Sequence, residues 1–318
     1  MTITQLQYVL AVAKHRNFTK AAEEVFVTQP TLSMQIQKLE SELDIQIFDR
    51  SKQPIALTEV GQKIVDQARI IVKESKRMQD VVDQEKGFIG GSFKLGIIPT
   101  IMPTLLPMFL KTFSLRYPKV QLKIEELNTS EIIEQLNEGD LDAAIAATPL
   151  EQDTILEWPL YYEPFVGYIP PHHRLAAQSE LNPEQLDLQD ILLLEDGHCF
   201  RDGIINLCKA TRINSEDTFK LKSGSFETLI KLSDEGLGMT LLPYLHTLDL
   251  SEDRKKHLKF FRDPSPAREV SLIYNNKKLK MQIIEVLHSL ISGIIRGAIA
   301  FHNVEIINPT TYSKEAQL

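Results

Sequence analysis

The stretch that decides the fold is FTKAAEEVFVTQPTLSMQIQKLESEL, from Phe18 to Leu43. Thr19 is placed to cap a short helix, and Thr28 is placed to cap a longer one. Pro30 is tolerated in the first turn of the longer helix, because the backbone N–H that proline lacks has no hydrogen-bond partner within the helix there. Apolar residues spaced three and four apart give the longer helix one buried face: Leu32, Ile36, Leu39 and Leu43. Two helices joined by so short a turn predict a helix-turn-helix.

The flanking segments extend this unit. Residues 4–14 predict a preceding helix, and residues 47–50 and 55–57 predict an extended hairpin, or wing, around Pro54. Polar side chains that could meet base edges lie off the buried face of the third helix: Gln29, Ser33, Gln35, Gln37 and Lys38. Basic residues could hold phosphates, Lys38 and Arg50 among them. These observations favour DNA binding, with a merely solvated polar face as the alternative.

Charge and composition limit the class of protein. The chain has 318 residues, with 43 acidic side chains against 35 Lys plus Arg, for a net charge of -8. That average argues against a nucleic-acid binder, but residues 1–57 hold six basic and six acidic side chains, so the negative surplus lies further along. We find neither a membrane-length apolar run nor a secretory signal, which predicts a cytoplasmic protein without a membrane partner.

A long helix is expected from Thr58 to about Lys86. Its apolar stripe is close to the heptad seam of a coiled coil: Val60, Ile64, Ala68, Ile71, Ser75, Met78 and Val82. Such a stripe needs a partner, which is a second copy or the chain's own body. Gly87, Gly90 and Gly91 then indicate a hinge.

Beyond the hinge, strands alternate with helices, which predicts an α/β fold with a mostly parallel sheet and two lobes around a cleft. The expected strands are residues 92–98, 120–127, 141–147, 165–169, 191–195, 218–221, 238–242 and 269–274, and the expected helices are residues 103–117, 130–136, 200 onward, 226–234 and 280–295. The ends of these strands would bring Thr100, Thr129 and His198 to the cleft. The domains expected are residues 1–58, 59–90 and 91–302, followed by a loose polar tail, 303–318.

Cys199 and Cys208 are nine positions apart in a segment rich in helix formers. In a helix this spacing gives an axial rise of roughly 13.5 Å, whereas a disulfide needs Cα atoms within about 7 Å. The sulfurs could therefore join only if the helix opened. We expect His198, Arg201 and the helix start to favour the Cys199 thiolate. The alternatives are two inert buried thiols or, with weaker support, a zinc site; we expect no metal or cofactor.

Three motifs resemble those of LysR-type transcriptional regulators: AA...VTQPTLS...I..LE within residues 18–43, LGIIPTIMPTLLP in residues 95–107, and LEDGHCFRD in residues 194–202 with Cys208 after it. The last is similar to a motif of the family's peroxide-sensing members. The resemblance implies a winged helix-turn-helix, a long linker helix and a two-lobed, periplasmic-binding-protein-like effector domain. It also implies a homodimer or homotetramer on a double-stranded DNA operator, working with RNA polymerase and reduced by glutaredoxin or thioredoxin.

The same resemblance implies roles for individual residues. Cys199 would be oxidised first by hydrogen peroxide and Cys208 would resolve it to a disulfide, in a regulator of oxidative stress genes. The peroxide-binding set would be Thr100, Thr129, His198, Asp202 (near Cys208) and Arg268 (near the thiolate). The DNA-binding set would be Gln29, Pro30, Ser33, Gln35, Lys38 and Arg50. Two alternatives stay open: a regulator that binds a small organic effector in the cleft, with passive cysteines, and a thiol peroxidase. The sequence has no CxxC motif, which argues against the enzyme.

Overall fold

The structure is a computed structural model that describes residues 1–85, 89–208, 224–276, 280–299 and 304–309. Contacts divide the chain into two units, residues 1–88 and 89–318. The strand expected at 218–221 and the hinge residue Gly87 lie outside the described residues. Within the described ranges, no helix has both the length and the apolar character needed to cross a membrane.

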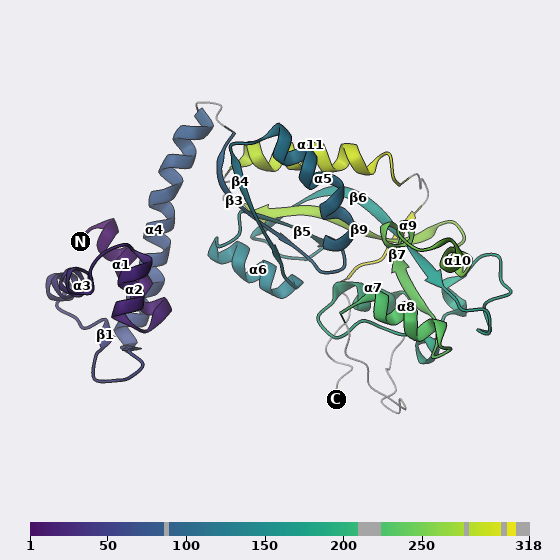
Figure 1. The fold of residues 1–318 in the computed structure, drawn as a ribbon, viewed down its shortest axis with the longest axis horizontal. Coiled ribbons are helices and arrows are strands. Elements are labelled where there is room, and N and C mark those ends of the chain that lie inside the picture. Colours follow the sequence, from purple (N-terminus) through teal and green to yellow (C-terminus); the bar gives the residue numbers. More distant parts are fainter. Residues whose placement is uncertain (86–88, 209–223, 277–279, 300–303, 310–318) are drawn as a thin grey trace. The chain divides into compact units, whose positions relative to one another are not determined.

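The first unit is the predicted helix-turn-helix with a wing (Figure 1). Its elements are α1 (Ile3–His15), α2 (Phe18–Glu24), α3 (Gln29–Leu43), β1 (Phe48–Asp49), β2 (Ala56–Leu57) and α4 (Glu59–Glu85), with β1 and β2 paired antiparallel. Thr28 caps α3, as predicted. The cap of α2 is Asn17, whose Oδ1 accepts from Thr19 N at 2.8 Å, so the prediction of Thr19 as the cap was wrong by two positions. Asn17 takes this role because it is the last extended residue before the helix.

The apolar stripe of α4 is divided between two uses. Val65, Ala68 and Val72 are buried in the core that α4 shares with α1 to α3, so this half of the helix packs on the chain's own body. Further along the helix, Met78 is 72 % exposed and Val82 is 42 % exposed. Of the predicted stripe, Ala68 therefore packs on the chain's own body, which is one of the two partners left open by the sequence.

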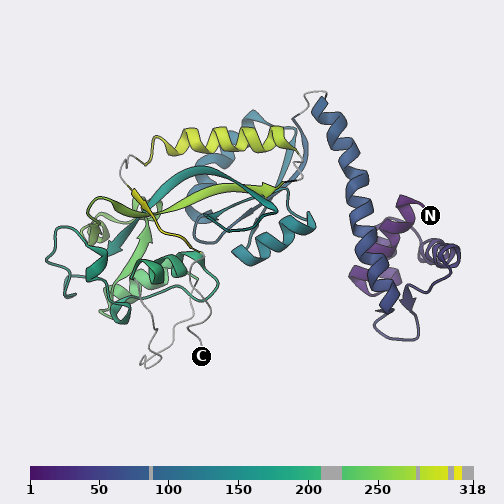
Figure 2. The same ribbon diagram turned by 180° about the vertical axis from the view of Figure 1, so that it is seen from behind.

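In the second unit, one sheet runs through both lobes (Figures 1 and 2). In the first lobe, β3 (Gly91–Ile97) pairs parallel with β4 (Val120–Glu126) and β5 (Ala143–Thr148). Two long strands, β6 (Ile155–Tyr168) and β9 (Ser265–Asn275), pair antiparallel and join the lobes, and β9 also pairs antiparallel with β5. In the second lobe, β7 (Thr240–Pro243) and β8 (Leu258–Phe260) pair antiparallel with the end of β6.

The mostly parallel sheet that we predicted is therefore wrong for the second lobe and for the joining strands. Sequence patterning found only the last residues of β6, because Pro159 and Pro164 interrupt it and a bulge lies between Pro159 and Tyr161. The strand expected at 191–195 is reduced to a single bridge between Ile191 and Met239.

Helices cover the sheet and position the site. The first lobe carries α5 (Met102–Arg116), α6 (Thr129–Glu138) and α11 (Met281–Ile295), and α5 and α11 lie together on one face while α6 lies on the other (Figures 1 and 2). The second lobe carries α7 (Cys199–Leu207), α8 (Phe226–Asp234), α9 (Tyr244–Leu248) and α10 (Glu252–Lys255), with short 3-10 turns at Pro183–Gln185 and Leu188–Asp190. Each lobe has its own apolar core.

Part of the polar tail is ordered against the body, which corrects the prediction of a loose tail. Residues Val304–Ile306 form β10, which pairs parallel with Ser265, Pro266 and Ala267 of β9. Ile307 N donates to Ala267 O at 2.8 Å, and Pro309 is buried. The tail docks because the backbone groups at the start of β9 offer hydrogen bonds that water would otherwise satisfy.

Candidate functional site

Helix α7 separates the two cysteines. Cys199 is its first residue and packs against the core of the first lobe, whereas Cys208 is its C-cap and packs against the core of the second lobe. Both thiols are free and partly buried. Phe200, Ile204 and Leu207 anchor the helix in the second core. The nine steps between the cysteines correspond to an axial rise of roughly 13.5 Å, so the thiols cannot pair while α7 is intact.

The environment of Cys199 differs from the prediction. Burial raises the pKa of the Cys199 thiol, and the charge of Arg268 is the strongest influence that lowers it. The Thr129 hydroxyl and the Ala147 backbone also favour the thiolate, while the Asp202 carboxylate opposes it. The net pKa is raised, so our expectation of a depressed value was wrong in direction. The reason is that desolvation of the thiolate outweighs the single nearby cation.

Two residues that we expected to act on Cys199, His198 and Arg201, engage other groups. Arg201 donates from Nη1 to Leu194 O at 3.1 Å and pairs through Nε with Asp196 at 3.0 Å. The Nε2 atom of His198 lies 3.8 Å from an oxygen of Glu195. His198 and Arg201 are neighbours of Cys199 in sequence, but the groups that lower the pKa of its thiol are Arg268, Thr129 and the Ala147 backbone.

Arg268 is fixed in place by residues from three other segments. Its Nη1 donates to Thr100 Oγ1 at 2.9 Å, and its Nη2 donates to Thr100 O at 3.1 Å. Its Nε and Nη2 both donate to Glu163 Oε2, at 2.9 and 2.7 Å. The guanidinium carbon lies 5.1 Å from the centre of the Phe200 ring, an arrangement that favours a cation. Thr100 thus belongs to the site through its contact with Arg268.

Thr129 reaches the site from the start of α6. The cap of α6 is Asn128, whose Oδ1 accepts from Glu131 N at 3.0 Å, so Thr129 is not used as a cap. Apart from its contact with the Cys199 thiol, the buried Thr129 Oγ1 has no hydrogen-bond partner among the described residues. The Tyr161 hydroxyl on β6 is also buried and has no hydrogen-bond partner among the described residues. Burial raises the pKa of this hydroxyl. Such hydroxyls can bind a small polar molecule.

Cys208 lies in a different electrostatic setting. Burial, together with the carboxylates of Asp187 and Asp190, raises the pKa of its thiol from 9.0 to about 12. Asp202, which we expected near Cys208, acts on Cys199 instead, and its own pKa is raised by burial. The acidic neighbours of Cys208 come from the 3-10 turn around residue 188, which the sequence did not single out.

Two members of the site were not found from the sequence. Glu163 lies 105 positions before Arg268, and Tyr161 lies two positions before Glu163 on the same face of β6. A charged residue inside the apolar end of β6 is the only signal that could have indicated Glu163. No cluster of three His, Cys, Asp or Glu side chains suited to a metal occurs in the described segments.

The predicted DNA-binding residues lie on or beside α3. Gln29, Pro30 and Lys38 are exposed, and Ser33 is partly buried. Gln35 is partly buried, and its Oε1 accepts from Gln5 Nε2 at 3.2 Å. Arg50 is bound within the unit: Nη2 contacts Glu40 Oε2 at 2.8 Å, and its guanidinium lies 5.2 Å from the Phe18 ring centre.

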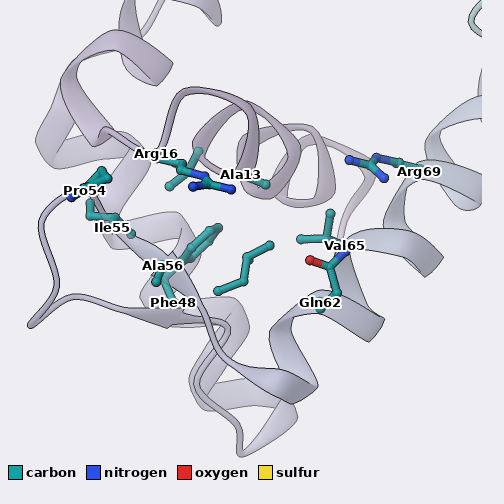
Figure 3. A pocket seen from close by; sticks show the side chains of 11 residues that line it. Ala13, Arg16, Phe48, Pro54, Ile55, Ala56, Gln62, Val65 and Arg69 are labelled. Carbon is teal, nitrogen blue, oxygen red and sulfur yellow. The ribbon is translucent and has the colours of Figure 1, made fainter.

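A cavity of about 400 Å³ lies between α1, the wing and α4. Phe48 and Val65 line it, and Arg16 and Arg69 approach it from opposite sides (Figure 3). None of the residues predicted for the site contributes to this cavity. It belongs to the first unit, whereas both cysteines belong to the second.

Comparison with known proteins places these features in a family. Residues 3–62 match the bacterial regulatory helix-turn-helix protein, lysR family, and residues 86–292 match the LysR substrate binding domain. The hydrogen peroxide-inducible genes activator of Haemophilus influenzae is 33% identical over 276 residues, which is 86% of this chain and 90% of that one. The DNA-binding transcriptional dual regulator OxyR of Escherichia coli K12 is 34% identical over 278 residues, covering 86% and 89%.

Solved structures of similar proteins cover nearly the whole chain. A cysteine-to-aspartate variant of full-length OxyR from Pseudomonas aeruginosa has a TM-score of 0.72 and 32% identity, covering 92% of this chain and 98% of that one. A cysteine-to-serine mutant of Corynebacterium glutamicum OxyR with hydrogen peroxide bound has a TM-score of 0.63 and 28% identity, covering 96% and 98%.

Proposed function

The chain belongs to the LysR family of bacterial transcriptional regulators, and we propose that it is a peroxide-sensing member switched by a reversible disulfide between Cys199 and Cys208. One observation carries the proposal: α7 holds the two cysteines at its opposite ends, and the first of them lies beside Arg268 and Thr129. The name of the Haemophilus influenzae relative, a hydrogen peroxide-inducible genes activator, and the hydrogen peroxide bound in the Corynebacterium glutamicum OxyR structure support the choice of signal.

The chemistry needs two steps. The Cys199 thiolate attacks one oxygen of hydrogen peroxide, so an S–O bond forms as the O–O bond breaks, and hydroxide leaves and takes up a proton to become water. The product is a sulfenic acid at Cys199. The Cys208 thiolate then attacks the Cys199 sulfur, so the S–S bond forms and the sulfenic oxygen leaves as water. In this way, peroxide is reduced to water by two electrons from the two thiols.

The polar groups around Cys199 suit the first step. Arg268 supplies positive charge where the thiolate develops, and the Thr129 hydroxyl, which bonds to the thiol, has hydrogen-bonding capacity left for a molecule as small as peroxide. Thr100 holds Arg268. His198 and Asp202 have smaller roles in the proposed peroxide site than Arg268 and Thr129. His198 lies beside Glu195, and the charge of Asp202 opposes the thiolate.

The second step forces a rearrangement. Cys208 reaches Cys199 only after α7 opens, which withdraws Phe200, Ile204 and Leu207 from the core of the second lobe. In the usual entropy model, closing a loop of ten residues in the opened chain costs about 2.7 kcal/mol of free energy, which the oxidation of the thiols can offset. The disulfide thus selects one of two packings of the lobe, and that change is the signal.

The helix-turn-helix binds DNA, as the family does. We propose that the exposed end of α4, with Met78 and Val82, joins two copies, and that two such dimers form a homotetramer on the operator. RNA polymerase would read the changed assembly, and glutaredoxin or thioredoxin would reduce the disulfide in the cytoplasm. We place the protein among regulators and not enzymes, because one peroxide is consumed per switching event.

The test uses the full-length reduced protein and a slight excess of hydrogen peroxide. We expect mass spectrometry to find a Cys199–Cys208 disulfide and footprinting on genomic fragments to change with it. The Cys208→Ser protein should stop at the sulfenic acid and keep the reduced footprint. A Cys199→Ser protein whose footprint still responds to peroxide would refute the proposal and favour an organic effector in the cleft.

A further inference from the structure

We propose that Glu163 is a positioning residue that governs how readily the Cys199 thiol ionises, by holding Arg268 and offsetting its charge. The proposal rests on the function above, since the reaction of Cys199 with peroxide is what Glu163 would tune. Glu163 lies on β6, whereas the two cysteines lie at the ends of α7, so the proposal extends the site to a distant strand.

Glu163 is itself rigidly placed. Its side chain is 1% exposed and that of Arg268 is 3% exposed, and the two residues face each other in the register of β6 with β9. Arg268 donates twice to Glu163 Oε2, while Oε1 accepts from Leu245 N at 2.9 Å, in the first turn of α9. The carboxylate is therefore used on both oxygens, and it cannot turn without losing one of these bonds.

The guanidinium also lies beside α7, where its carbon is 5.1 Å from the centre of the Phe200 ring. Arginine has five N–H donors, and the four bonds to Glu163 and Thr100 use four of them. The fifth, on Nη1, has no acceptor among the described residues. Phe200, which follows Cys199 directly, lies under the guanidinium. Glu163 and Thr100 thus fix the plane of Arg268 so that its charge stays beside the first turn of α7.

Charge gives Glu163 its second effect. Arg268 lowers the pKa of Cys199 but does not overcome burial, so the pKa remains raised. A carboxylate at 2.7 Å cancels much of the field of a buried guanidinium. If Glu163 loses its charge while Arg268 keeps its place, more of the positive charge acts on Cys199, and the thiolate becomes easier to form.

Other ionisable groups around the pair cannot substitute for Glu163. Tyr161, on the same strand, stays protonated because burial and Glu163 raise its pKa. Burial lowers the pKa of His246 on α9, which disfavours its charged form. Asp202 is the remaining carboxylate that acts on Cys199, and it acts directly from α7 and not through Arg268.

The experiment compares Glu163→Gln, Arg268→Gln and the double variant, all in full-length Cys208→Ser protein, so that only the first oxidation is measured. Peroxide reaction rates and iodoacetamide alkylation rates of Cys199 are followed as functions of pH. We expect Glu163→Gln to lower the midpoint of the pH–rate profile of Cys199 by about one pH unit. Below that midpoint, the reaction rates of Cys199 should rise about tenfold. Arg268→Gln should raise the midpoint.

The double variant separates an effect through Arg268 from a general one. Without Arg268, the Glu163 carboxyl is 1% exposed and has no cation to pair with, so it takes up a proton and carries no charge that could act on Cys199. The double variant should therefore match Arg268→Gln. The control is Glu157→Gln, on the same strand, whose Oε1 accepts from Leu150 N at 2.7 Å; its midpoint should equal that of the parent.

Two results would overturn the proposal: a folded Glu163→Gln protein with an unchanged midpoint, or an equal shift from Glu163→Gln in the Arg268→Gln background. If Glu163→Gln does not fold, as judged by its thermal transition, the comparison of Arg268→Gln with the double variant decides, because the double variant has no unpaired buried charge. Alkylation also separates the two proposals, since it reports the ionisation of Cys199 even if peroxide does not react.

Discussion

Cys208 should be nearly inert towards electrophiles in the reduced protein. Its pKa is raised from 9.0 to about 12, so below pH 9 the ionised fraction is about a thousandfold smaller than for an ordinary thiol. The Cys199→Ser protein leaves Cys208 as the only cysteine, because the chain has two. Its alkylation by iodoacetamide should therefore be about a thousandfold slower in native buffer than in concentrated urea at the same pH.

The same shift makes stability depend on pH. The folded pKa of Cys208 lies above the unfolded one, so its contribution to folding is complete below pH 9 and is lost as pH rises towards 12. Three pKa units correspond to at most about 4 kcal/mol, and solvent access to the partly exposed thiol lowers this figure. The urea midpoint should fall in that window, and the fall should be smaller in Cys208→Ser.

Asp187→Asn tests the cause. Asparagine keeps the capping bond to Gln189 N, now 3.0 Å from Oδ1, but removes a carboxylate that raises the pKa of Cys208. Alkylation of Cys208 should become faster in the folded protein and stay unchanged in urea. The reasoning fails if native Cys208 already reacts about as fast as in urea, or if Asp187→Asn slows it.

Three further outcomes are expected. Thr129→Val should raise the pKa of Cys199 and slow its oxidation at neutral pH, whereas Thr129→Ser should keep the parent pH profile; equal profiles for both would contradict the role of the hydroxyl. Asn206→Ala removes the 2.7 Å hydrogen bond from Asn206 Nδ2 to Asn308 O, so it should lower the free energy of unfolding by about 1 kcal/mol. Amide hydrogen exchange in residues 304–308 should become faster, and unchanged exchange would argue against docking through this bond. Lys38→Ala should reduce the slope of log affinity against log salt by about one in anisotropy titrations with operator DNA, and an unaltered slope would remove Lys38 from the phosphate contacts.

Local signals predicted the first unit well. The caps and the spacing of α3 act within a few residues, so Thr28 and the stripe from Leu32 to Leu39 could be assigned from sequence. The error at α2 was of the same kind: Asn17 and Thr19 both can cap, and only the backbone conformation distinguishes them. Most of the long strand β6 was missed, because its prolines interrupt the pattern in the sequence although the sheet tolerates them.

The redox site shows the limit of sequence reasoning more clearly. The spacing of Cys199 and Cys208 and the helix between them are local properties, and they determined that the thiols are kept apart in the reduced protein. The identity of the cation beside Cys199 is not local. Arg201 is the nearer in sequence, yet Arg268 acts on the sulfur, because β9 returns between the lobes and brings it there.

The sequence by itself therefore determined the family, the helix-turn-helix and the two thiols at the ends of one helix, since each depends on neighbours within a few turns. Tertiary structure alone decided the acidity of those thiols. Burial against two different cores, Glu163 paired with Arg268 across 105 positions, and the acidic turn beside Cys208 all arise from contacts between distant segments. Electrostatic energies depend on distance and solvent access in space, which the order of residues along a chain does not specify.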